Sequence, residues 1–155
     1  MRAFQRTVLT VAVLLVPYPI HAQQSAEVTQ IKSWLGAYEA AFVAKDLVKL
    51  APFYHPDVTI FEGGGVNNGW ADFRDNHLGP ELKAYENLRF STTNVVVHLR
   101  GDGRSAYVTS EYAIKAIWKG RDDQARGLQT MVLVKSDDGT WKIRHSHTSM
   151  RPPPQ

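Results

Sequence analysis

The sequence predicts an α+β domain in which helices precede a sheet of mostly antiparallel strands. Helical periodicity is confined to the first half of the chain, where apolar residues recur every three or four positions between Ala26 and Lys45. After Asn87, apolar and alternating runs are separated by turn signals such as Asp102-Gly103 and Asp138-Gly139. Helices followed by a strand meander favour α+β over alternating α/β units.

Three helices and five strands are expected in this order. The helices cover residues 26–45, 46–54 with Asp46 as N-cap, and 70–78 or somewhat beyond. The strands cover residues 58–61, 90–99, 106–119, 128–135 and 141–149, and residues 120–127 are interpreted as a turn. A sheet that accommodates three helices on one face must be strongly curved, so we expect a pocket inside it.

The N-terminus has the layout of a secretory signal peptide. Arg2 and Arg6 precede an uncharged stretch, and the small residue Ala22 precedes polar Gln23. A packed amphipathic helix is the alternative, but prolines interrupt the segment. The apolar run is shorter than the roughly 20 residues of a membrane span. We therefore expect a signal peptide over residues 1–22, export to the periplasm or medium, a domain over 23–150 and a disordered tail over 151–155.

Composition excludes several classes of function. The chain has 155 residues, enough for one domain, and no cysteine, which excludes disulfides and thiolate metal sites. Without the signal peptide, 16 basic residues face 15 acidic ones. A balance this even argues against a nucleic-acid partner. The glycines 63–65 lack the lysine of a phosphate-binding loop, so no nucleotide cofactor is expected.

The last strand suggests a metal site. Because alternate residues of a strand point the same way, Trp141 and Ile143 point into the core together with His145 and His147. The first expectation for function is therefore a pocket that binds a divalent transition metal, zinc or else copper, nickel or iron. Its predicted ligands are Glu62, His77, His145 and His147. The alternative is that the histidines are buried, neutral and hydrogen-bonded.

The same residues also permit acid/base chemistry without a metal. Glu62 in an apolar pocket would have a raised pKa and could exchange a proton with a substrate carbon. His147 or Tyr112 would polarise the carbonyl group of a small apolar compound. The predicted ligand pocket is aromatic and consists of Trp34, Tyr38, Trp70, Phe73 and Tyr112. A plain interaction module with a residual pocket is a third possibility.

Two strands are apolar on both faces, which suggests that a second subunit covers the sheet. The residues that carry this homodimer prediction are Val95, Val97, Met131 and Leu133. His55 and His98 are expected at the surface.

Two segments resemble a known superfamily. Tyr54-His55-Pro56-Asp57 before the first strand and residues 139–149, with their Trp-x-Ile-x-His-x-His-x-Ser pattern, are similar to the NTF2-like superfamily, within it to SnoaL-like and DUF4440-type domains. The resemblance covers residues 26–149 and implies a cone-shaped fold, an internal pocket and a homodimer. Its members include ketosteroid isomerase, polyketide cyclases, scytalone dehydratase and limonene epoxide hydrolase, so it leaves the reaction type open. The second carboxylic acid that ketosteroid isomerase needs has no counterpart among the expected inward residues.

Overall fold

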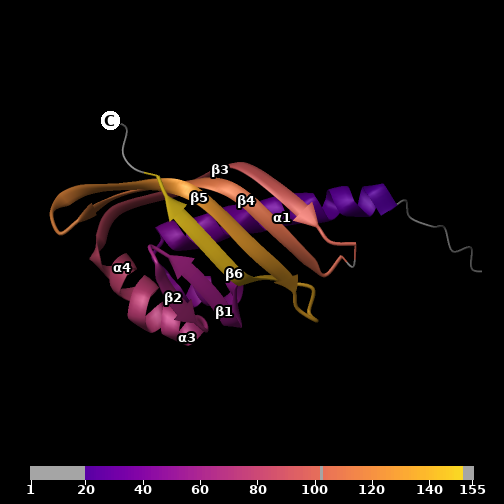
Figure 1. Ribbon diagram of the computed structural model, residues 1–155, viewed down its shortest axis with the longest axis horizontal. Helices are drawn as coiled ribbons and strands as arrows, with labels where there is room; N and C mark the ends of the chain where they lie inside the picture. Colours follow the sequence, from indigo (N-terminus) through magenta and orange to yellow (C-terminus); the bar gives the residue numbers. More distant parts are fainter. Residues whose placement is uncertain (1–19, 102, 152–155) are drawn as a thin grey trace, which may run out of the picture.

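A computed structural model describes residues 20–101 and 103–151. The predicted signal peptide lies mostly outside this part, and so does most of the predicted tail. Helices pack on one side of a strongly curved six-stranded sheet, as Figure 1 shows, and this confirms the α+β prediction. No helix among the described residues is long and apolar enough to cross a membrane.

The first helices follow the periodicity of the sequence. Helix α1 (Ile20–Val43) presents its apolar stripe to the sheet, and α2 (Leu47–Leu50) continues into the short 3₁₀ turn η1 (Ala51–Phe53). Asp46 caps α2 as predicted, because its carboxylate accepts from the backbone N–H groups of Val48 and Lys49 at 3.1 and 3.0 Å.

The third helical segment begins at Trp70 as predicted and continues beyond Leu78 to Ala84. It consists of α3 (Trp70–Phe73), the π-helical turn η2 (Arg74–Leu78) and α4 (Gly79–Ala84). Gly79 allows the wide turn to close, since a Cβ atom there would lie 2.5 Å from the carbonyl oxygen of Arg74. The π-helical turn contains His77, which it carries toward the first strand.

The sheet has the strand order β2-β1-β6-β5-β4-β3. Its strands are β1 (Tyr54–Glu62), β2 (Gly65–Asn68), β3 (Tyr85–Leu99), β4 (Ser105–Trp118), β5 (Arg121–Lys135) and β6 (Trp141–Met150). Within the described chain, β1 and β6 pair in parallel and the other neighbours pair antiparallel.

Two tight turns account for the longer β5 and for the additional strand β2. Lys119 and Gly120 both have positive φ angles, 51° and 75°, so β4 turns directly into β5. The turn expected over residues 120–127 was therefore wrong, because most of it extends β5. Gly63 and Gly64 make a similar reversal, after which β2 pairs with β1.

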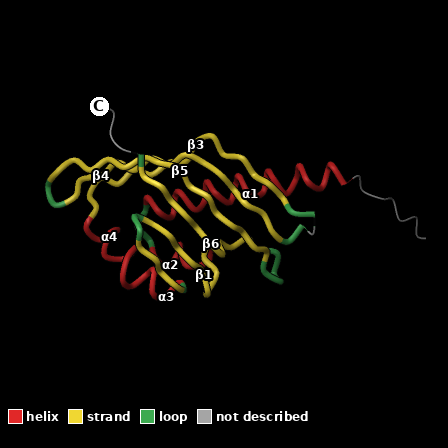
Figure 2. Tube along the Cα trace, in the orientation of Figure 1, coloured by secondary structure: helices red, strands yellow, loops and turns green. Residues whose placement is uncertain are grey.

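The core lies between the concave face of the sheet and α1, which runs across it in Figure 2. Ile31 and Leu35 of α1 are buried together with Leu133, Trp141 and Ile143 of the sheet. Beyond this core, α3, η2 and α4 cover the part of the concave face near β1 and β2 (Figure 1). The space between these helices, α1 and the sheet contains the candidate site.

Candidate active site

A bulge in β6 decides which side chains enter this space. Leu133 pairs with Ile143, but its neighbour Val132 pairs with His145, so Arg144 is an extra residue on β6. One extra residue exchanges the two faces of the strand beyond it. Trp141 and Ile143 point inward as predicted, whereas Ser146 and Thr148 take the inward positions after the bulge.

His145 and His147 therefore lie on the outer face of the sheet, and the prediction that they point inward was wrong. Their rings contact the exposed ring of Phe61, with centroid distances of 4.9 and 6.0 Å. Glu62 follows Phe61 in β1 and points to the concave side, where His77 is its neighbour. The four predicted metal ligands are thus divided between the two faces. Among the described residues, no three His, Asp or Glu side chains are placed to hold a metal ion together.

The concave side encloses a cavity of about 50 Å³, which has room for a few water molecules or a small organic group. Glu62, Tyr38, Phe73 and Tyr112 line it, as the sequence suggested. The other lining residues are Phe42, Tyr54, Ile60, Leu78, Glu81, Phe90, Ile114, Gln129, Ile143, Ser146 and Thr148.

Trp34 and Trp70, which were also predicted to line the pocket, lie behind its wall. Trp34 stacks on Tyr38 with a centroid distance of 6.2 Å, and Trp70 stacks on Tyr54 at 4.6 Å. Each indole supports a tyrosine whose ring does line the cavity. The prediction that Trp34 and Trp70 contact the ligand directly was therefore wrong, and the two indoles instead position these tyrosines.

A row of polar side chains crosses the concave face of the sheet. Gln129 of β5 pairs with Ser110 of β4 on one side and with Thr148 of β6 on the other. Glu62 of β1 continues the row beside Thr148, since the preceding residues Phe61 and His147 are paired. We call Ser110, Gln129, Thr148 and Glu62 the polar row. It interrupts an otherwise apolar core and brings four strands to one site.

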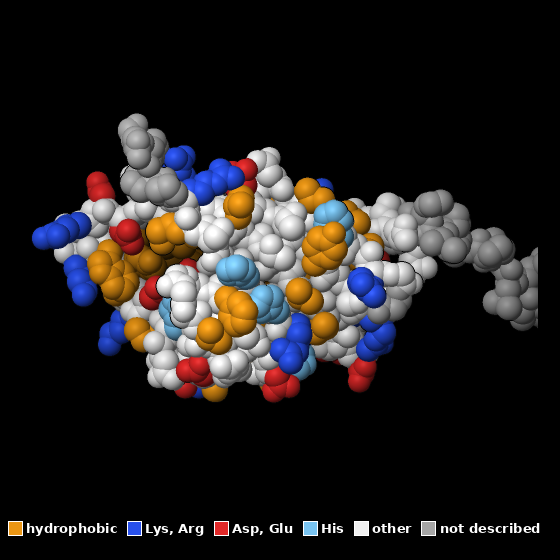
Figure 3. Space-filling view, viewed as in Figure 1, with side chains coloured by type: hydrophobic (Ala, Val, Ile, Leu, Met, Phe, Trp, Pro, Cys, Tyr) orange, Lys and Arg blue, Asp and Glu red, His pale blue; other side chains and the backbone are white. Residues whose placement is uncertain are grey.

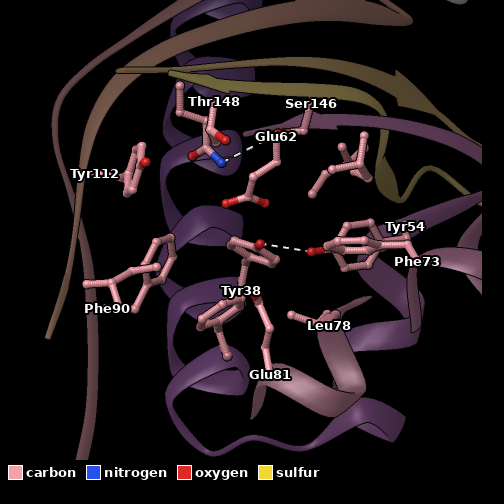
Figure 4. Close-up of a pocket in the computed structure, with 15 residues that line it drawn as sticks. Tyr38, Tyr54, Glu62, Phe73, Leu78, Glu81, Phe90, Tyr112, Ser146 and Thr148 are labelled. Atoms are coloured by element: carbon pink, nitrogen blue, oxygen red, sulfur yellow. Dashed lines mark hydrogen bonds between the residues drawn. The ribbon is translucent and has the colours of Figure 1, made fainter. Parts of the chain in front are cut away.

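Glu62 is the carboxylate at the centre of the cavity, where Figure 4 shows it pointing toward the hydroxyl group of Tyr38. Burial raises the pKa of Glu62, and the nearby charge of Glu81 raises it further. His77 and a hydrogen bond with Thr148 oppose this shift. The side chain keeps 37% of its surface accessible, so a ligand can reach it. Glu62 therefore has the properties of a general base or acid.

Two buried tyrosine hydroxyls face Glu62. The Tyr38 and Tyr54 oxygens lie 2.9 Å apart and share a hydrogen bond (Figure 4). Burial raises the pKa of Tyr38 to about 12 and the pKa of Tyr54 well above its usual value. Both groups therefore stay protonated, and the pair can donate one hydroxyl hydrogen to a ligand oxygen in the cavity.

His77 is held by a chain of polar groups beside Glu62. Its Nδ1–H donates to Asn67 Oδ1 at 2.7 Å, and the amide of Asn67 donates to Asp72 at 3.2 Å. Its Nε2 atom lies 3.5 Å from Glu81 and 3.8 Å from Glu62. The hydrogen bond with Glu81 is the main reason why the pKa of His77 is raised. Both carboxylates thus favour the protonated form of His77.

Several polar lining residues were missed from the sequence. Gln129, Ser146 and Thr148 reach the cavity because of the bulge and the strand register, which sequence periodicity does not reveal. Gln129 did carry a local signal, since it is an isolated amide within the apolar run of β5. Glu81 was missed because it lies in α4, beyond the part of the third helix whose inward face was assigned.

Comparison with known proteins identifies the family to which this chain belongs and finds its fold in NTF2-like structures. The sequence profile of the SnoaL-like domain matches residues 31–153, and the chain belongs to this family. The resemblance inferred from the sequence is thereby confirmed. A search of curated proteins finds no match to this chain.

Three solved structures illustrate the shared fold. An NTF2-like superfamily protein from Salmonella enterica serovar Typhimurium is 18% identical, with a TM-score of 0.76 over 84% of this chain and 94% of that one. A proposed scytalone dehydratase from Novosphingobium aromaticivorans is 14% identical, with a TM-score of 0.75 over 86% and 89%. A hexachlorocyclohexane dehydrochlorinase is 15% identical, with a TM-score of 0.71 over 85% and 90%. At these identities the likeness establishes the fold alone.

Proposed function

We propose that this chain is an acid/base enzyme, a lyase or isomerase that removes a proton from carbon next to a carbonyl group. The observation that carries the proposal is the pairing of Glu62 with the Tyr38–Tyr54 hydroxyls in one small cavity. A base whose pKa is raised by burial and a donor that stays neutral are the two groups this chemistry needs.

In the proposed reaction, the Glu62 carboxylate takes the proton from the carbon beside the carbonyl group. The electrons of the broken C–H bond move into a new C=C bond, and the carbonyl oxygen gains negative charge. The Tyr38–Tyr54 pair donates a hydrogen bond to that oxygen. The protonated Glu62 then returns its proton to another carbon, which completes an isomerisation, or to a departing oxygen, which completes an elimination.

The structure favours this function over metal binding. His147, which was expected to assist either chemistry, lies on the outer face, while Tyr112 remains a second hydroxyl at the cavity wall. Two proteins of the same fold are named for eliminations, a dehydratase and a dehydrochlorinase. These names support the class of reaction but say nothing of this protein's substrate.

The test is deuterium exchange at the carbon next to the carbonyl of three small ketones, butan-2-one, cyclopentanone and 3-hydroxybutan-2-one, followed by proton NMR in D₂O. Wild-type protein should accelerate the exchange of at least one ketone, and Glu62→Gln should reduce that rate by a factor of about 100 or more. Glu86→Gln, which changes an exposed glutamate on β3, is the matched control and should leave the rate unchanged. Exchange no faster than in buffer for all three ketones, or equal rates in wild type and Glu62→Gln, would contradict the proposal.

The homodimer remains a proposal, but with different contact residues. Met131 and Leu133 are 1% and 0% exposed and belong to the core, and Val95 and Val97 also pack against it. The outer face of the sheet is toward the viewer in Figure 3. By strand register, the exposed apolar side chains on this face are Phe61, Val66, Val96, Tyr107 and Leu128. We propose that a second copy covers them. Leu128→Asp should then yield a monomer in light scattering, and a wild type that is already monomeric would contradict this.

A further inference from the structure

The polar row contains a buried acceptor that the proposed reaction does not use. Gln129 is only 7% exposed, and its Nε2 atom donates to Ser146 Oγ at a distance of 3.5 Å. Its other amide atom, Oε1, is fully buried and accepts no hydrogen bond from any described residue. A buried carbonyl oxygen without a donor destabilises the fold, so native proteins rarely keep one without a reason.

The position of Gln129 suggests what that reason is. Its side chain lines the same cavity as Glu62. The neighbouring Ser146 hydroxyl already accepts from the Gln129 amide, and Thr148 is hydrogen-bonded with Glu62. Because the Gln129 side chain lines the cavity while its Oε1 atom is buried just behind the wall, a small rotation of the amide presents an acceptor that a hydroxyl hydrogen can satisfy. Gln129 and Glu62 are separated by β6, which places their backbones about 10 Å apart across the sheet. Two side chains reaching inward across that span can contact one compound of a few carbon atoms.

We propose that Gln129 determines substrate specificity, and that its Oε1 atom accepts a hydrogen bond from a hydroxyl group of the substrate. The substrate class is then a small hydroxylated ketone or aldehyde rather than a simple carbonyl compound. The carbonyl group of this substrate follows from the proposed function, on which this part of the inference rests. A site built to pair with a hydroxyl discriminates strongly against the analogue that lacks it, because the buried acceptor is then left unpaired.

The experiment compares the binding of three probes by NMR titration: 3-hydroxybutan-2-one, butan-2-one and 3-methoxybutan-2-one, which keeps the oxygen but cannot donate. Wild type should bind the hydroxy ketone at least tenfold more tightly than either of the others. Gln129→Met preserves the side-chain length and removes the acceptor, so the affinities for hydroxy ketone and butan-2-one should become equal within a factor of two. Thr130→Val, which changes the neighbouring exposed residue on the outer face of β5, is the matched control and should keep the preference.

A wild-type protein without this preference, or a preference that survives in Gln129→Met, would overturn the inference. If Gln129→Met does not fold, Gln129→Ala deletes the same acceptor, and Gln129→Glu keeps one and should retain the preference. Deuterium exchange of butan-2-one separates this outcome from the proposed function, since it depends on Glu62 and should persist within a few-fold in Gln129→Met. If the protein catalyses deuterium exchange but does not prefer the hydroxy ketone, only this inference is wrong. If it prefers the hydroxy ketone but does not catalyse the exchange, the proposed reaction is wrong.

Discussion

The hydrogen bond between Tyr38 and Tyr54 can be tested by a double-mutant cycle. Both side chains are buried, and their hydroxyl oxygens lie 2.9 Å apart. Tyr38→Phe leaves the Tyr54 hydroxyl without this partner, and Tyr54→Phe does the same to Tyr38. Each single variant should therefore lose about 1–2 kcal/mol of unfolding free energy. The double variant removes both polar groups and should cost no more than one single variant, which gives a coupling of about 1–3 kcal/mol.

The assay is urea unfolding followed by tryptophan fluorescence, with thermal unfolding as a second measurement. For a domain of this size, a loss of 1 kcal/mol lowers the Tm by about 3–6 °C. The double variant should melt at or above the temperature of the less stable single variant. If the two single losses simply add in the double variant, the hydroxyls do not depend on one another, and the tyrosine pair is not the donor that the proposed reaction requires.

Three further predictions follow from individual residues. The pKa of Glu62 is raised above 4.5 in the folded protein, so the ionisation of Glu62 lowers the free energy of unfolding as pH rises past that value. Glu62→Gln lacks this group, and its stability relative to wild type should therefore increase between pH 4.5 and 7. A stability difference that stays constant over this range would contradict the raised pKa. Gly127→Ala should cost more than about 2 kcal/mol by denaturant unfolding, since its Cβ would lie 1.9 Å from the Ser149 carbonyl oxygen, whereas Gly101→Ala meets nothing within 4 Å and should be nearly neutral. Intact mass of exported protein should correspond to a chain that begins at Gln23, and a mass that includes residues 1–22 would refute the predicted cleavage.

Local sequence patterns determined most of the architecture. The apolar periodicity of residues 26–45 identified the buried face of α1, because a helical period of 3.6 residues is a local property. The Asp46 cap and the change from helical to strand periodicity after Asn87 are local in the same sense. The inward direction of Tyr112 also followed from simple alternation along an unbroken strand.

The tertiary structure alone decided how the site is assembled. A single extra residue at Arg144 moved His145 and His147 to the outer face and turned Ser146 and Thr148 inward. A bulge depends on pairing with the neighbouring strand, so alternation within one strand carries no sign of it. The polar row likewise exists because strand register brings together residues from β4, β5, β6 and β1 that are far apart in the chain. Sequence patterns determine the face of a regular element, whereas register between elements determines which side chains meet.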